Sequence, residues 1–182
     1  MAASEPAWVR DVLEFWFREL GDAHWFARSN TIDGQIRVRF LELHERLATG
    51  RDLTAPRQML AAVIVLDQFS RNMFRGTPRA FAADAIARGL ARQAIDSSYD
   101  SAMTRAERMF LYLPFEHSED REDQALAVRL ITQLGNKEWT RYAVAHQAII
   151  ERFGRFPHRN AILGRPSSAD ELAALEEPLG SF

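Results

Sequence analysis

The sequence contains no cysteine, and this absence excludes several kinds of functional site. Disulfide bonds, thiolate nucleophiles and cysteine-bound metal centres all require a thiol. A chain without disulfides also fits a reducing compartment. We therefore expect a cytoplasmic protein.

Long apolar runs are also missing. The longest run, MLAAVIVL at positions 59–66, is far shorter than the about 20 residues that a membrane-spanning helix needs. The first residues, MAASEPAWVRD, lack the basic region and apolar core of a signal peptide. The sequence therefore predicts a soluble protein with no membrane partner.

Charge of one sign is not in excess. The chain has 23 Lys and Arg against 25 Asp and Glu, a formal net charge of −2, and Lys137 is its only lysine. Without a basic surface or a basic, aromatic-rich strand, no nucleic-acid partner is expected. The arginines do offer planar guanidinium groups, which suit carboxylates and phosphates better than lysine does.

The residues that are present favour one helical domain. Hydrophobic residues make up 47 % of 182 residues, enough for a real core in a single domain over residues 1–182. Apolar residues recur three and four positions apart, and no alternating strand pattern appears. The short connections predict an all-α fold of seven to eight helices stacked as antiparallel hairpins. Helices are predicted over residues 6–20, 31–49, 56–75, 78–95, 105–115, 119–134, 138–153 and 169–177.

Residues typical of helix starts support these boundaries. Thr104 with Glu107, and Ser168 with Glu171, have the spacing of capping boxes. Pro114 is expected to kink or end its helix. Single capping side chains are predicted at Ser4, Thr54, Thr77 and Ser118.

The stretch LAAVIVLDQFSRNMFR, residues 60–75, changes from apolar to polar without a helix breaker. In a helix, Asp67 and Arg71 are four residues apart on the side that should be buried. We expect them to form an ion pair shielded from water, because buried charges are rarely left without a partner. Two interpretations stay open: a structural network that fixes the helix register, or the wall of a polar pocket.

Two further segments carry polar residues that helix capping does not explain. Glu116 and His117 precede the predicted start of the next helix. Residues 155–160, RFPHRN, form a turn around Pro157 with two arginines, a histidine and an asparagine. By contrast, His44 is predicted to be an ordinary surface or edge residue, and His146 a core or edge residue.

Three blocks of sequence, DQFSRNMFRGTPRAFAADAIA (67–87), FLYLPFEHSEDREDQ (110–124) and ERFGRFPHRNAILGR (151–165), resemble the signature blocks of an uncharacterised family, the domain of unknown function numbered 924. The resemblance covers nearly the whole chain. It implies an all-α fold similar to tetratricopeptide-repeat superhelices, although no 34-residue repeat is visible. It implies no activity, substrate or cofactor, so no catalytic residue is transferred.

Our principal hypothesis is that the three blocks converge on one concave face. They would form an arginine-rich pocket for a small anionic ligand or an acidic peptide. Four arginines would supply charge, and two asparagines would orient the ligand. The candidate ligand-binding residues are Asp67, Gln68, Arg71, Asn72, Arg75, Glu116, His117, Arg155, His158, Arg159 and Asn160.

Two alternatives use the same chain differently. In a hydrolase-like enzyme, His117 or His158 would be the general base, with Asp67 or Glu116 as its partner. A homodimeric scaffold without a small ligand is the other alternative. No HExxH or comparable motif is present, so we predict no metal site and no cofactor.

Overall fold

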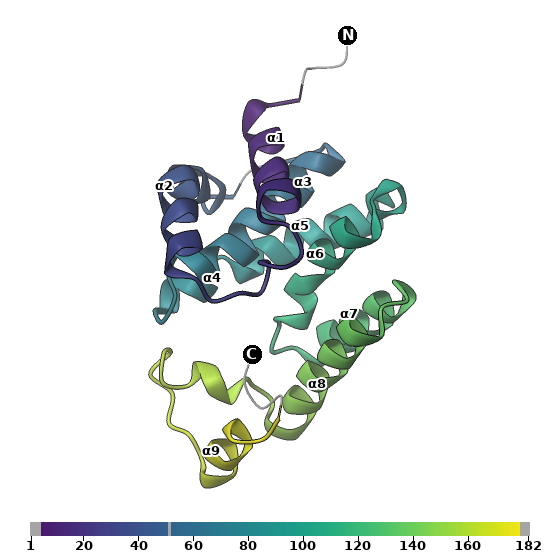
Figure 1. The fold of residues 1–182 in the computed structure, drawn as a ribbon. Helices are drawn as coiled ribbons and strands as arrows, with labels where there is room; N and C mark the ends of the chain where they lie inside the picture. Colours follow the sequence, from purple (N-terminus) through teal and green to yellow (C-terminus); the bar gives the residue numbers. More distant parts are fainter. Residues whose placement is uncertain (1–4, 51, 179–182) are drawn as a thin grey trace. The chain divides into compact units, whose positions relative to one another are not determined.

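The computed structural model describes residues 5–50 and 52–178, and all regular structure in these ranges is helical (Figure 1). The predicted all-α class is therefore confirmed. The contacts divide the chain into two compact units: unit 1 is Met1–Arg75 with Arg79–Ala102, and unit 2 is Gly76–Pro78 with Met103–Phe182. The single domain and the tetratricopeptide-like superhelix stay predictions.

Unit 1 is built around the stretch that the sequence marks as its apolar centre. Every residue from Met59 to Leu66 is 0 % exposed. The aromatic rings of Phe15, Trp16 and Phe40 pack against Phe69 at centroid distances of 5.9, 5.5 and 4.8 Å. Its elements are α1 (Ala7–Glu14), the π-helical η1 (Phe15–Leu20), α2 (Asn30–Leu47), α3 (Pro56–Val63), the π-helical η2 (Ile64–Phe69), α4 (Ser70–Met73), α5 (Asp84–Asp96) and the 3-10 turn η4 (Tyr99–Ala102).

The predicted helix over 56–75 is one continuous rod, but its middle is not α-helical. The π-helical turn η2 separates α3 from α4 and contains both Asp67 and Gln68. Such turns occur mostly as single bulges inside α-helices. Thr54 does not cap the rod, because Ala55 occupies the N-cap position and makes no side-chain bond there.

Unit 2 contains a helix hairpin. α7 (Arg121–Gln133) and α8 (Lys137–Phe153) pack side by side along their length (Figure 1). Gly135 makes the tight turn between them with a φ of 71°, a value that favours glycine. α6 (Arg105–Glu116) packs against α7, and η5 (Pro157–Arg159) contacts α9 (Ala169–Leu175). Phe156 and Ile150 are fully buried in a cluster with Ile149.

The two predicted capping boxes are confirmed, with both reciprocal bonds present at the starts of α6 and α9. Pro114 does not end α6 at its own position, since the helix continues to Glu116. Proline lacks an N–H donor and its ring crowds the carbonyl four residues earlier, and α6 ends two residues after it. None of the described helices is long and apolar enough to cross a membrane.

Two other predicted starts are wrong. Thr77 and Pro78 do not begin an α-helix: a 3-10 turn, η3 (Pro78–Phe81), comes first and α5 begins at Asp84. Ser118 is not the cap of α7, because Asp120 accepts the bonds from the first N–H groups instead. The predicted cap at Ser4 lies outside the described residues.

Candidate functional site

The predicted ion pair between Asp67 and Arg71 is present. Their side chains lie 3.0 Å apart, and Asp67 is 0 % exposed. Arg71 also donates to both carboxylate oxygens of Asp84 at 3.0 Å, and Gln68 donates to Asp67. Burial disfavours the charge of Arg71, but the two carboxylates outweigh it and raise its pKa. A permanently charged guanidinium therefore joins η2 to α5.

The other two polar residues of this block face a different carboxylate. Arg75 donates to both oxygens of Asp33 at 2.8 and 2.9 Å, and Asn72 donates to the same group at 2.8 Å. Burial acts to raise the pKa of Asp33, but the bonds from Arg75 and Asn72 lower it overall. Asp33 belongs to α2, so this contact ties α2 to the end of the central rod. The geometry is that of a structural network within unit 1.

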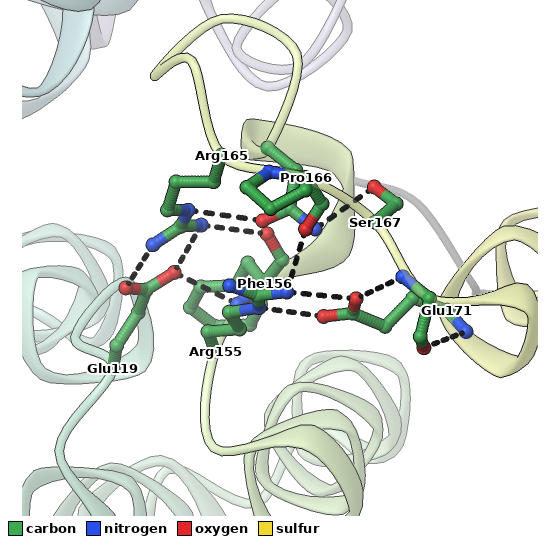
Figure 2. Close-up of polar contacts among 9 residues, drawn as sticks. Glu119, Arg155, Phe156, Arg165, Pro166, Ser167 and Glu171 are labelled. Atoms are coloured by element: carbon green, nitrogen blue, oxygen red, sulfur yellow. Dashed lines mark hydrogen bonds and ion pairs between the residues drawn. The ribbon is translucent and has the colours of Figure 1, made fainter.

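In unit 2, Glu119 and side chains of residues 155–171 form a polar network that Figure 2 shows. Glu119 accepts two bonds from Arg165, at 2.8 and 2.9 Å, and one from the backbone N–H of Phe156 at 2.8 Å. Arg165 also donates to Asn160 at 2.9 Å, and the Asn160 amide donates to Ser167 at 3.0 Å. Asn160 is 0 % exposed, so its amide serves this loop.

Arg155 is held by the same network (Figure 2). It donates to both oxygens of Glu171, at 2.6 and 2.8 Å, and to the carbonyl of Pro166 at 2.9 Å. The Arg155 bonds lower the pKa of Glu171 to about 2, with help from the backbone N–H of Ser168. The charge of Arg155 is thus engaged by a carboxylate that stays ionised.

The remaining candidates of unit 2 surround the buried ring of Phe156. The Arg159 guanidinium lies 4.6 Å from the centre of this ring, and the rings of His158 and His146 lie 5.5 and 5.6 Å from it. His117 lies 6.2 Å from His146. His117 and His158 are half-buried. We call Glu116, His117, His146, His158 and Arg159 the histidine cluster.

Glu116 and His146 form the buried centre of the histidine cluster. Glu116 Oε1 and His146 Nδ1 are 3.1 Å apart, and these residues are only 2 % and 6 % exposed. Burial lowers the pKa of His146 well below its ordinary value, and positive charges on its neighbours act in the same direction. Although the distance suits an ion pair, the imidazole therefore stays neutral and its Nδ1–H is a hydrogen-bond donor.

A second acceptor fixes the orientation of this imidazole. The carbonyl of Tyr142, one turn earlier on α8, lies 2.9 Å from His146 Nδ1. With two acceptors at Nδ1, the neutral ring carries its proton there, and Nε2 is left with its lone pair. The arrangement can accept a proton at a defined atom.

The backbone before α7 is held by buried donors. Gln124, which is 0 % exposed, donates to the carbonyls of Glu116 and Ser118 at 2.6 and 2.7 Å. Arg159 donates to the carbonyl of His117 at 2.9 Å. These bonds fix the turn that carries His117, and they join the second sequence block to the third.

The predicted site residues thus fall into two sets. Asp67, Gln68, Arg71, Asn72 and Arg75 belong to unit 1, and the other six belong to unit 2. Within unit 2, four of these six enter the histidine cluster, and Arg155 and Asn160 enter the network of Figure 2. Convergence of all three blocks on one face stays a prediction.

Sequence reasoning missed two histidines. His146 was expected in the core or at its edge, but its partner Glu116 was predicted to pair with His117 or His158 instead. His44 is buried rather than a surface residue, with its Nε2 atom 2.7 Å from Ser70 Oγ. A lone histidine on an apolar helix face gives too weak a signal to identify such partners. Among residues 5–50 and 52–178, no group of three or more histidines and acids is arranged to hold a metal ion.

Comparison with known proteins identifies a family and a structural neighbour. A family model described as "Bacterial protein of unknown function (DUF924)" matches residues 12–179. The solved structure of a protein of unknown function from Agrobacterium tumefaciens is 38 % identical and superposes with a TM-score of 0.86. That match covers 93 % of this chain and 97 % of the other. None of the curated proteins that were compared matches the chain.

Proposed function

The chain belongs to the DUF924 family of bacterial proteins, and we propose from its own side chains that it binds a small anion, such as phosphate or a carboxylate, at the histidine cluster. The observation that carries this proposal is the gathering of three histidines and Arg159 around the ring of Phe156. His117 follows the end of α6, His146 lies on α8, and His158 and Arg159 lie on η5, so the fold brings them together from distant parts of the chain.

The electrostatics of the histidine cluster favour a negative ligand. Positive charge on His117, His158 and Arg159 acts on the buried His146 and disfavours a further proton there. An anion at the same place is favoured by the same charges. Guanidinium and imidazole groups also suit phosphate and carboxylate oxygens as hydrogen-bond donors. His117 and His158 are half-buried, so the cluster reaches the surface through them.

The experiment is a thermal-shift titration of the full chain with sodium phosphate, sodium acetate and a glutamate-rich peptide at constant ionic strength. A ligand that binds only the folded state raises the midpoint, and at 100 times its Kd it stabilises by about 2.7 kcal/mol. We expect phosphate or acetate to do so, and we expect R159Q to remove the effect.

The matched control is R129Q, because Arg129 is exposed on α7 and lies outside the histidine cluster. It should respond to the anions as the unaltered chain does. Equal responses in R159Q and R129Q would contradict the proposal. A response to the peptide alone would assign the site to a peptide partner instead.

A second candidate function is acid–base catalysis, favoured by the contact between Glu116 and His146. Glu116 would orient the imidazole, and His146 Nε2 would accept the proton of a nucleophilic water. The pair thus takes the roles that the sequence suggested for Glu116 with His117 or His158. Turnover of 4-nitrophenyl acetate that H146Q abolishes, while phosphate binding persists, is the expected result for an enzyme.

The absence of cysteine supports a cytoplasmic location. A homodimer remains an alternative, and sedimentation at two protein concentrations tests it.

A further inference from the structure

The histidine cluster contains one permanent positive charge and one acid. Arg159 is always charged, and Glu116 is the only carboxylate among the five residues of the cluster. These two charges balance while Glu116 is ionised and the three imidazoles are neutral. A bound anion disturbs the balance in a site whose central residues, Glu116 and His146, are 2 % and 6 % exposed. Because uncompensated charge is costly away from water, the anion favours a further positive charge in the cluster.

The imidazole of His146 is placed to hold that positive charge. Its Nδ1 atom lies 3.1 Å from Glu116 Oε1 and 2.9 Å from the carbonyl of Tyr142, so two acceptors face one N–H group. A proton added at Nε2 changes the contact with Glu116 from a hydrogen bond of a neutral ring into an ion pair. The distance already suits both states, so the pair can change its charge without moving either side chain.

The other members of the histidine cluster keep this imidazole neutral until an anion arrives. Burial lowers the pKa of His146 well below its ordinary value, and positive charge on His117, His158 and Arg159 acts in the same direction. A negative ligand beside these three residues offsets their effect on His146. The bound state therefore favours the proton that the free state disfavours.

Charged groups reach His146 from three directions. Glu116 and His117 lie at the end of α6, and His158 and Arg159 lie on η5. α7 packs along α8 and contributes one buried acid, Asp123. The Asp123 carboxylate accepts a bond from Ser118 Oγ at 2.8 Å, so it serves the turn before α7. Glu116 is therefore the acid that stabilises a charged His146.

We infer that the histidine cluster takes up one proton with each anion that it binds, and that Glu116 and His146 hold this proton as an ion pair. The inference rests on the proposed function and states how pH regulates that site. The proton comes from the solvent and ends on His146 Nε2. The half-buried His117, whose ring centre lies 6.2 Å from that of His146, provides a route from the surface, because neighbouring imidazoles can pass protons.

The sign of the pH effect follows from this proton balance. The site holds one more proton with the anion than without it, so affinity rises as pH falls. This rise covers the interval between the pKa of His146 in the free chain and its higher pKa in the occupied site. For one proton, the Kd falls by up to about tenfold for each unit of decreasing pH.

The test is calorimetric titration of the full chain with sodium sulfate, and with sodium acetate in parallel, at constant ionic strength. Both anions keep their charge near neutral pH, whereas phosphate itself changes protonation there. Each titration is made in two buffers with different heats of ionisation, and the difference in heat gives the number of protons taken up. We expect uptake approaching one proton per bound anion at about pH 7.

NMR of the ring nitrogens locates the proton without any substitution. At saturation with sulfate, both ring nitrogens of His146 should move to the positions of a charged imidazolium. E116Q cannot form the ion pair and should lose most of the proton uptake and of the pH dependence. The matched control is E151Q, at an exposed glutamate of the same helix as His146, and it should behave as the unaltered chain does.

Three results would overturn the inference and leave the proposed anion site standing. The anions could bind without proton uptake, His146 could stay neutral in the bound state, or E116Q could take up as much proton as E151Q. Absence of binding by sulfate, acetate and phosphate would instead overturn the proposed function together with this inference.

Discussion

Asp67 in unit 1 and Glu116 in unit 2 are both buried carboxylates, with exposures of 0 % and 2 %, but their partners differ. Asp67 faces a guanidinium that is always charged, and Glu116 faces an imidazole that burial keeps neutral. The first contact holds two charges in one arrangement. The second leaves a proton that can be shared or moved. Two equally buried carboxylates therefore differ in chemistry, because one faces a fixed charge and the other faces a neutral group that can exchange a proton.

The largest expected effect breaks the contact in unit 1. R71A would leave Asp67 buried without its cation, and removing one partner of a buried pair costs about 3–5 kcal/mol. Urea unfolding should show this loss as a lower midpoint. R10A, at an exposed arginine 3.9 Å from Asp11, should change the free energy of unfolding by less than about 0.5 kcal/mol. A midpoint for R71A equal to that of R10A would contradict the ion-pair assignment.

The matched change in unit 2 sharpens the comparison. E116Q keeps the shape of Glu116 and an oxygen that can accept the His146 N–H bond, and only the charge of the acceptor is lost, so the expected loss is about 1 kcal/mol or less. D67N should cost clearly more. Urea unfolding of both variants under one set of conditions makes the comparison. The reverse order would show that Glu116, rather than Asp67, carries the structural role.

A third test uses pH. The pKa of His146 is lowered in the folded state, and so is that of His44. The unfolded chain then binds protons that the folded chain does not, so stability should fall as pH drops through the ordinary histidine value of about 6.5 and on toward the lower pKa of the folded state. H146Q should show a smaller fall in urea midpoint over this interval. An identical pH profile in H146Q would mean that folding does not shift the pKa of His146.

The smallest effect is expected at the exposed end of unit 1. Arg75 binds Asp33 with two bonds, but its side chain is 41 % exposed. Exposed pairs contribute about 0–1 kcal/mol, so R75A should lower the free energy of unfolding by about 1 kcal/mol or less. Measurement in 1 M NaCl should reduce the difference further, because salt screens exposed charges. A loss as large as that of R71A would place Arg75 among the buried groups.

Much of the fold could be predicted from residue spacing. Helical periodicity identified the central rod, and the capping boxes at Thr104 and Ser168 are local patterns that need no tertiary contact. The π-helical turn η2 was missed because it depends on packing around the rod rather than on a residue type. Ser118 was predicted as the cap, but the cap is Asp120, two residues later. Serine and aspartate are equally good capping residues, so the sequence alone does not distinguish the two positions.

The candidate site was predicted less completely. Asp67 and Arg71 are close in sequence, so helical spacing was enough to pair them. His146 lies thirty residues from Glu116, and no local pattern joins such distant residues. The acids that engage the candidate arginines also lie beyond helical spacing: Asp33, Asp84 and Glu171 are 42, 13 and 16 residues from their partners.

The central claim is that the histidine cluster binds a small anion, and one measurement tests it most directly. Sodium phosphate is titrated into the full chain at constant ionic strength while the ring nitrogens of all five histidines are followed by NMR. His24 is exposed and serves as an internal control. We predict that the signals of His117, His146 and His158 shift together and saturate while His24 stays in place. Unchanged cluster signals, or a shift of His24 of the same size, would contradict the account.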